Sequence, residues 1–234
     1  MAAPIFGSGV AAVREDGRVT GDGSVGGRGL RDDLARYYDQ DAAARAAREP
    51  AAERVRRRAG FVALLAAEGR TRVLEVGLGP GQDARAVQAV GLAVAGIDLS
   101  AEHVRLARAA GVDAHVAAAQ EIPYPDGSFD AVWCMSVLMH MPDTDLHEAL
   151  AEMARVLVPG GVAALGMWGG EDTAGVNPDD TLDPPRYFSW RSEATMRALI
   201  EEHAVVEEFD TWTTDVGHTY QWCVARFGRR TASA

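Results

Sequence analysis

Cysteine, long apolar runs and basic charge are all scarce in this chain, and each scarcity excludes a class of protein. The 234 residues include two cysteines, Cys134 and Cys223, whose separation fits neither a disulfide framework nor a zinc site. No apolar stretch approaches the length of a membrane span, and the N-terminus lacks a signal-peptide pattern. A net charge of −11 argues against a nucleic-acid binder, which needs a basic face to replace phosphate counterions. We therefore expect a soluble cytoplasmic protein with no nucleic-acid or membrane partner.

The chain has enough apolar material for one domain, with 47% hydrophobic residues. Residues 1–29 are rich in glycine and show no sustained apolar period, so we expect a flexible tail before a domain over residues 30–234. Residues 30–69 predict an N-terminal helical cap, with Val55, Val62 and Leu65 on one face. In an acidic protein we expect the arginines around that face to be solvated: Arg54, Arg56, Arg57 and Arg58.

A strand that ends in alternating glycines is the most informative feature. Residues 73–81 read VLEVGLGPG, a branched apolar run that leads into Gly77, Gly79 and Gly81. Such a run predicts a buried parallel strand that turns sharply into a helix. Glycines let the amide groups of the turn approach a ligand closely. A second apolar run ends at Asp98, whose carboxylate can accept hydrogen bonds from both hydroxyls of a ribose. The pattern predicts a site for a ribose-bearing cofactor.

The glycine spacing and Glu75 narrow the choice of cofactor. The dinucleotide fingerprint GxGxxG has a glycine at its sixth position, where this chain has Gln82. Glu75 lies inside the strand, where a carboxylate would repel a pyrophosphate but can pair with a cationic α-amino group. The site therefore favours a cofactor with an amino-acid end and no phosphate. An acidic residue followed by GxGxG resembles the first motif of the class I S-adenosylmethionine (SAM) methyltransferases.

Three further segments resemble the same family, in the family's order. IPYPDGSFDAVWC (residues 122–134) resembles the segment before the fourth strand, VLMHMPD (residues 137–143) the loop after it, and LVPGG (residues 157–161) the turn into the fifth. The resemblance covers about residues 37–167. It implies that SAM is the cofactor and that its methyl group passes by in-line displacement to a small-molecule acceptor. An O, N or S nucleophile of the kind found in secondary metabolism is expected.

The order of the apolar runs predicts the fold. Strands and helices alternate over residues 72–167, which predicts an α/β fold with a doubly wound parallel sheet and ligands above the carboxyl ends of its strands. The runs at residues 205–211 and 220–226 have a short connection and predict an antiparallel hairpin. We therefore expect the seven-stranded, mostly parallel sheet of the class I methyltransferase fold.

The resemblance implies a cofactor contact at each position that matches a family motif. These positions are Tyr38, Glu75, Gly77, Gly79, Gly81, Asp98, Leu99, Ala119, Gln120 and Cys134. Family members commonly have an Asp before the small residue that frames the adenine, but Ala118 stands there in this chain. The adenine amine would then bond to a backbone carbonyl or to Gln120. Tyr37 and Tyr38 resemble a tyrosine pair that folds over the sulfonium, with helix packing as the alternative.

The residues expected to face the acceptor are Tyr37, His140, Trp168, Arg186 and Tyr187. The usual pKa range of histidine suits a general base, with substrate positioning or a surface location as alternatives for His140. Alignment of reactants lowers a barrier by roughly 7–11 kcal/mol, which exceeds the ~10²–10⁴-fold contribution of a base. Loss of His140 therefore need not abolish activity. No carboxylate cluster indicates a magnesium site, so we expect a metal-independent reaction.

Residues 168–192 form an insertion that is too long and too polar for a simple connector. Because it follows the fifth predicted parallel strand, it should lie over the site as a substrate-covering lid, with an ordinary surface loop as the alternative. Its aromatic residues point to a small, partly aromatic or apolar acceptor. We expect His147 and His218 to be exposed bystanders.

Two other classes of function remain open. A nucleotide-dependent oxidoreductase predicts GxGxxG and no PDGSFD segment. A non-catalytic protein with the SAM-binding fold would typically have lost the glycine turn or Asp98, and both are intact here. The sequence does not decide which acceptor atom is methylated, nor whether the chain is a monomer or a homodimer.

Overall fold

The computed structural model describes residues 27–214 and 217–228, so residues 1–26 of the expected flexible tail lie outside it. Two helices precede the first strand: α1 (Gly27–Ala46) and α2 (Ala52–Ala67). The remaining elements follow in chain order: β1 (Arg72–Val76), α3 (Gln82–Gln88), β2 (Ala93–Asp98), α4 (Ala101–Ala109), β3 (Asp113–Val116), β4 (Phe129–Met135), η1 (Leu138–His140), α5 (Asp143–Val156), β5 (Leu157–Gly169), β6 (Thr173–Val176), β7 (Tyr187–Trp190), α6 (Glu193–Glu201), β8 (Ala204–Thr213) and β9 (Thr219–Phe227).

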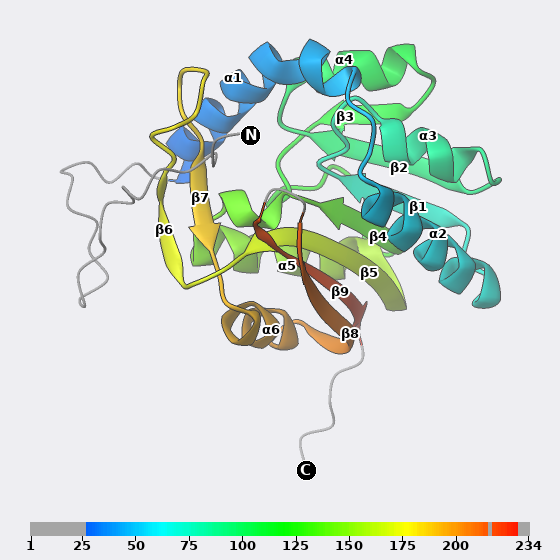
Figure 1. Cartoon of the computed structure of the whole chain (residues 1–234). Coiled ribbons are helices and arrows are strands. Elements are labelled where there is room, and N and C mark those ends of the chain that lie inside the picture. The colour runs from blue at the N-terminus through cyan, green and yellow to red at the C-terminus, as the bar shows by residue number, and fades with distance from the viewer. Residues whose placement is uncertain (1–26, 215–216, 229–234) are drawn as a thin grey trace.

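A seven-stranded sheet organises the molecule, in the order β3-β2-β1-β4-β5-β9-β8 (Figure 1). The first five of these strands run parallel, and β9 runs antiparallel to both β5 and β8. The strand order reverses between β1 and β4, and ligands of open α/β sheets bind at such a switch point. The predicted α/β fold, with a mostly parallel doubly wound sheet and an antiparallel C-terminal hairpin, is confirmed.

Helices on both faces of the sheet account for the apolar strands (Figure 1). Along β4, Val132 and Cys134 pack in one hydrophobic cluster with α5 and α6, and Ala131 and Trp133 pack in another with α2, α3 and α4. None of these four side chains is more than 2% exposed. Because neighbours along a strand point to opposite faces, a strand covered on both sides needs a continuous apolar run.

The N-terminal helical cap consists of two helices separated by residues 47–51. Leu65 is fully buried on α2, as expected. Val55 is 40% exposed instead of buried, and Phe61 and Arg57 share the inner face with Leu65. The buried face of α2 therefore differs from the predicted one. Apolar periodicity assigns an arginine to the solvent side, so it does not place Arg57 on the buried face.

The arginines of α2 do not all lie on a solvated face. Arg56 does, with a side chain that is 65% exposed. The other three pair with carboxylates of α3 and β8: Arg54 and Arg58 with Asp83, and Arg57 with Glu208 and Asp210. The prediction is wrong for these three because their acidic partners come from distant parts of the sequence, where helical periodicity gives no sign of them.

The insertion after β5 is folded, with β6 and β7 paired as an antiparallel hairpin that lies beside α1 (Figure 1). Polar side chains inside it bond to one another, since Arg186 donates to the carboxylate of Asp180 at 2.9 and 2.6 Å. Gln40 of α1 donates to the carbonyl of Asp183 at 2.7 Å. A segment that is polar in sequence thus forms a hairpin attached to the N-terminal cap.

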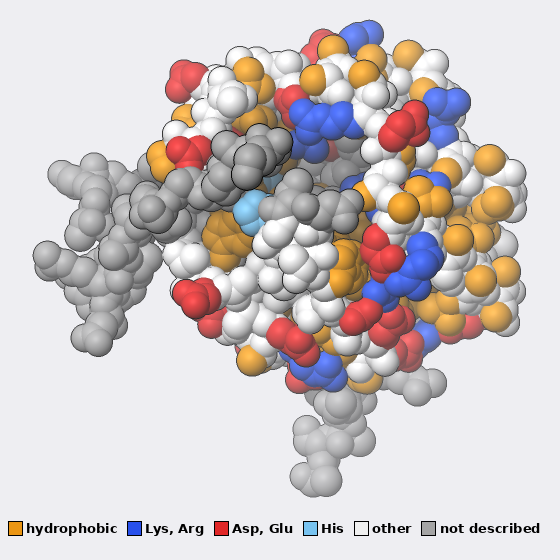
Figure 2. All heavy atoms as spheres, in the orientation of Figure 1, with side chains coloured by type: hydrophobic (Ala, Val, Ile, Leu, Met, Phe, Trp, Pro, Cys, Tyr) orange, Lys and Arg blue, Asp and Glu red, His pale blue; other side chains and the backbone are white. Residues whose placement is uncertain are grey.

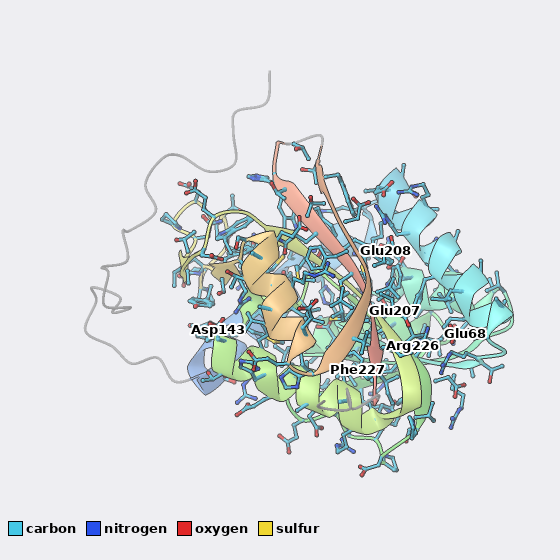
Figure 3. All side chains as sticks on the ribbon, turned by 90° about the horizontal axis from the view of Figure 1, so that it is seen from below. Glu68, Asp143, Glu207, Glu208, Arg226 and Phe227 are labelled. Atoms are coloured by element: carbon cyan, nitrogen blue, oxygen red, sulfur yellow. The ribbon has the colours of Figure 1, made fainter. Side chains whose placement is uncertain are left out.

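A charged cluster joins α2 to the C-terminal hairpin of β8 and β9 (Figure 3). Arg226 of β9 donates to Glu68 at the end of α2 and to Glu207 of β8, and these three labelled side chains lie near one another in that view. Its guanidinium lowers the pKa of Glu68 to about 2. Phe227, which follows, is fully buried. The cluster fastens the helical cap to the sheet at the edge away from the carboxyl ends of the parallel strands.

Acidic and basic side chains are interspersed over the face of the molecule in Figure 2. Among residues 27–214 and 217–228, no helix is long and apolar enough to cross a membrane.

Candidate functional site

A cavity of about 500 Å³ opens above the carboxyl ends of β1, β2 and β4. Its walls include the turn after β1, the residues after β2 and β4, and parts of α1 and α2. Sequence reasoning placed ligands at this edge of the sheet. Eight of the residues predicted to bind cofactor or acceptor line the cavity: Tyr38, Gly77, Gly79, Asp98, Leu99, Ala119, His140 and Trp168.

The three glycines of the turn have left-handed backbones but different surroundings. A Cβ at Gly77 would lie 2.1 Å from Val137, so this glycine lets the turn pack against the loop after β4. A Cβ at Gly79 would meet open space, which leaves that backbone bare toward the cavity. Gly81 begins α3 and packs against Ala107 of α4, so it supports the turn from outside the lining.

Asp98 is buried at the end of β2 and already accepts several hydrogen bonds. Its Oδ2 accepts from the backbone N–H of Gly79 at 2.8 Å. Its Oδ1 accepts from the backbone N–H of Ser100 at 2.8 Å and from Nδ1 of His103 at 3.3 Å. These contacts hold the glycine turn, the start of α4 and the carboxylate in one arrangement.

Glu75 lies inside the sheet and behind the cavity wall, with 2% exposure. Burial raises its pKa well above the usual range, and the neighbouring carboxylate of Asp83 raises it further. Desolvation disfavours the charged form of a carboxyl group. The carboxyl that the sequence predicted as the charged partner of an α-amino group is therefore held in surroundings that disfavour its charged form.

Only some of the remaining residues that the sequence predicted to contact the cofactor lie on the cavity wall. Leu99 and Ala119 line the cavity, whereas Gln120 and Cys134 lie outside its lining. Gln120 donates to Asp145 at 2.9 Å, and its Oε1 has no partner among the described residues. Cys134 is fully buried, and burial raises the pKa of its thiol, which disfavours the thiolate that a nucleophile requires.

His140 sits in a defined hydrogen-bond arrangement beyond β4. Its Nδ1 lies 2.8 Å from the backbone carbonyl of Tyr187, which can only accept, so Nδ1 carries the proton. Its Nε2 then accepts from the hydroxyl of Tyr38 at 2.9 Å. Burial lowers the pKa of His140 to about 3, so the usual pKa range assumed from the sequence does not apply.

Tyr37, Arg186 and Tyr187 lie behind His140 and outside the described lining of the cavity. The guanidinium of Arg186 lies 4.3 Å from the ring centre of Tyr37, which is 6% exposed. Tyr187 contributes the carbonyl that fixes the His140 tautomer. Arg186 thus links Tyr37 of α1 to the residue just before β7, and Tyr187 links β7 to η1.

Sequence reasoning missed most of an aromatic end of the cavity, where Trp212, Tyr220 and Trp222 join Trp168. Ser136, after the end of β4, has a φ of 60°, a left-handed conformation that is uncommon outside glycine. Its hydroxyl lies 3.0 Å from that of Tyr220. The three missed aromatics belong to β8 and β9, far in sequence from the motifs, and no local pattern marks them as cavity residues.

Sequence reasoning also missed the charged wall beside the glycine turn. Arg54 Nε donates to Asp83 at 2.6 Å, Arg58 donates to the same carboxylate, and Trp133 Nε1 donates to it at 2.9 Å. The paired arginines lower the pKa of Asp83 despite its burial. Arg54 and Asp83 both line the cavity, so a guanidinium and a carboxylate lie side by side on this wall.

The two histidines expected to be exposed bystanders are half-buried and have contacts. His147 Nδ1 lies 2.9 Å from Nε2 of His203, and the ring of His218 lies 5.0 Å from that of Trp168. Within the described part of the chain, no group of three or more His, Cys, Asp or Glu side chains is placed to hold a metal ion.

The sheet order, the glycine turn after β1 and the carboxylate after β2 define the class I methyltransferase fold. Residues 74–165 match the model of the methyltransferase domain family. A solved structure of Burkholderia thailandensis 1,6-didemethyltoxoflavin-N1-methyltransferase, bound to 1,6-didemethyltoxoflavin and S-adenosylhomocysteine, is similar with a TM-score of 0.66. That match has 20% identity and covers 85% of this chain and 87% of the other. The resemblance stated from the sequence is confirmed.

Two curated relatives are similar over shorter stretches. The 27-O-demethylrifamycin SV methyltransferase of Amycolatopsis mediterranei is 39% identical over 139 residues, which cover 56% of this chain and 48% of that protein. A ubiquinone biosynthesis O-methyltransferase of Xanthomonas oryzae pv. oryzae is 39% identical over 97 residues, which cover 38% and 40%. The chain thus matches about half the length of these relatives or less.

Proposed function

We propose that this chain transfers the methyl group of SAM to a small-molecule acceptor. The observation that carries the proposal is one cavity with two different ends. At one end the bare backbone of Gly79 adjoins the carboxylate of Asp98, and at the other stand aromatic rings. A cofactor with a ribose fits the first end, and an apolar or planar acceptor fits the second.

The residues present fit SAM without a phosphate-binding cradle. Asp98 would hold the ribose, Leu99 and Ala119 would frame the adenine, and the wall at Arg54 would attract the methionine carboxylate. Bound SAM supplies a sulfonium-activated methyl group. The protein must align a nucleophile with it and exclude water, and alignment alone can lower the barrier by roughly 7–11 kcal/mol.

The relatives favour a hydroxyl group as the nucleophile. Two of them carry O-methylation in their names, 27-O-demethylrifamycin SV methyltransferase and ubiquinone biosynthesis O-methyltransferase. The rings of Trp168, Trp212 and Tyr220 would pack against an acceptor with a ring of its own. We therefore propose a small acceptor in which a hydroxyl is attached to an apolar or aromatic skeleton.

His140 would act mainly through Tyr38. With a pKa of about 3 it remains neutral, and its Nε2 fixes the direction in which the Tyr38 hydroxyl donates. The Tyr38 oxygen then keeps a lone pair for the acceptor hydroxyl. His140 is thus a positioning residue in this proposal, and Tyr38 is the group that contacts the acceptor.

The β6–β7 hairpin would cover the acceptor as a lid. Trp168, near the end of β5 and ahead of the hairpin, lines the cavity, and the backbone carbonyl of Tyr187 at the start of β7 bonds to His140. A cover at this position excludes water from the transfer.

Calorimetry of the whole chain tests the cofactor assignment against both alternatives. We expect S-adenosylhomocysteine (SAH) and SAM to bind one per chain and NADH to show no heat of binding. Transfer from methyl-tritiated SAM to a panel of small phenols and hydroquinones then separates an enzyme from a non-catalytic binder. NADH binding, or no binding of SAH, contradicts the proposal.

A further inference from the structure

His103 is a buried histidine on the cofactor side of the cavity that no sequence motif marks. It lies on the first turn of α4, it is 2% exposed, and it lines the cavity. Ser100, the N-cap residue of α4, accepts from the backbone N–H of His103 at 3.1 Å. Asp39 of α1 accepts from the Ser100 hydroxyl at 2.6 Å, so α1 holds this turn in place.

The hydrogen bonds of His103 define its tautomer. Its Nδ1 lies 3.3 Å from Oδ1 of Asp98, and a carboxylate can only accept, so Nδ1 carries the proton. Its Nε2 is then an acceptor. That atom is buried and has no hydrogen-bond partner among the described residues. Buried polar atoms are nearly always paired, and an exception calls for an explanation.

The contacts of Asp98 leave it too few free acceptor positions for a ribose. A carboxylate has about four lone-pair positions, and Asp98 uses three of them for Gly79, Ser100 and His103. One position remains, whereas the two adjacent hydroxyls of a ribose offer two donors. Asp98 cannot accept both hydroxyls without giving up a contact that holds the glycine turn or α4.

We propose that His103 is a second ribose-binding residue: its Nε2 accepts a hydrogen bond from one ribose hydroxyl, and Asp98 accepts the other. This inference rests on the proposed function, because it concerns the cofactor of that site. The unpartnered acceptor on His103 and the remaining position on Asp98 together match the two donors of a ribose. The ring of Tyr38, 5.7 Å from that of His103, lies on the same wall and links this site to His140.

Calorimetric titration of the whole chain with SAH and with its 2′-deoxy and 3′-deoxy analogues tests the proposal. His103→Asn keeps an amide near the Nδ1 position and so preserves the contact with Asp98, but it removes the acceptor at Nε2. We expect it to raise the Kd for SAH about 2- to 12-fold, the range for one hydrogen bond. His103→Gln places an amide oxygen near the Nε2 position and should keep more of the affinity.

The analogues distinguish a ribose contact from a general packing effect. If the proposal holds, one deoxy analogue binds the wild type and His103→Asn equally, because the hydroxyl that His103 accepts is already missing. Equal losses for SAH and for both analogues overturn it. A wild-type chain that binds no SAH overturns the proposed function instead, and this inference with it.

A measurement on the wild type keeps the test independent of folding in the variants. Nitrogen-15 NMR of the histidine side chains reports whether Nε2 of His103 accepts a hydrogen bond. We expect its resonance to move on addition of SAH in the direction of a hydrogen-bonded acceptor. A His103 Nε2 resonance unchanged at saturating SAH overturns the proposal.

Discussion

Burial determines the chemistry of single residues around the cavity. It lowers the pKa of His140 and raises those of Glu75 and Cys134, in each case because desolvation disfavours the charged form. The sequence identified all three positions but supplied only the usual chemistry of each residue type. At this scale, the residue type gave no sign of how burial shifts the protonation of each group.

The carboxylate of Asp98 should be the strongest single contact to the cofactor. Asp98→Ala is expected to weaken SAH binding by roughly 1.5–3 kcal/mol, the range for hydrogen bonds to charged groups. The change also removes the acceptor for the Gly79 and Ser100 amides, so the turn loses part of its support. Calorimetry measures the loss, and Asp113→Ala on the exposed start of β3 is the matched control. An unchanged Kd in folded Asp98→Ala would remove this residue from the site.

The buried His140 should make folding stability depend on pH. Its pKa is about 3 in the folded chain and 6.5 in the unfolded one, so the unfolded state gains the proton first and stability falls as the pH drops below 6.5. Each pKa unit corresponds to about 1.4 kcal/mol, so His140 should account for about 2 kcal/mol lost between pH 7.5 and 5. Urea unfolding of His140→Phe should show a shallower decline than the wild type. His115→Phe, on an exposed histidine, should decline like the wild type; equal slopes in all three would contradict the low pKa.

At the scale of elements, the sequence predicted the helices and strands that a local pattern of apolar and capping residues marks. The parallel strands and their helices follow from apolar runs and caps, such as Ser100 before α4. The β6–β7 hairpin does not, because it is held by contacts among its polar residues and by Gln40 of α1. The inward position of Arg54 and Arg57 on α2 was not predicted either, because their carboxylate partners, Asp83 and Asp210, are remote in sequence.

The hairpin should behave as a lid attached at a few points. Gln40→Ala removes the bond from α1 to the carbonyl of Asp183, so hydrogen exchange over residues 177–187 should become faster. SAH affinity should remain nearly unchanged, because neither residue lines the cavity. Exchange measured by mass spectrometry compares this variant with Arg197→Ala, whose salt bridge on α6 is largely exposed. Exchange that is equally fast in the wild type and in Gln40→Ala would show that this bond does not restrain the hairpin.

For the whole molecule, the doubly wound parallel sheet and the placement of ligands above the carboxyl ends of its strands were predicted from the alternating strands and helices, and they are the most predictable features. Which side chains complete the cavity was less predictable. Tyr220, Trp212 and Trp222 reach it from β8 and β9 only because the last strand runs antiparallel beside β5. Tertiary arrangement, and not local pattern, therefore supplies much of the aromatic end.

Binding at the glycine turn should stabilise the entire chain. A ligand at 100 times its Kd adds about 2.7 kcal/mol, which for a domain of this size is a rise in Tm of roughly 5–10 °C. Gly79→Val should abolish this rise with SAH, because the branched side chain enters the space that the cofactor needs.

Gly69→Val is the matched control: both glycines have a positive φ, 56° and 64°, and open space at Cβ, but Gly69 lies away from the cavity. Both variants should lose similar stability without ligand from backbone strain, about 1–2 kcal/mol, and only Gly69→Val should keep the rise. A full rise in Gly79→Val would show that the cofactor does not bind against this turn.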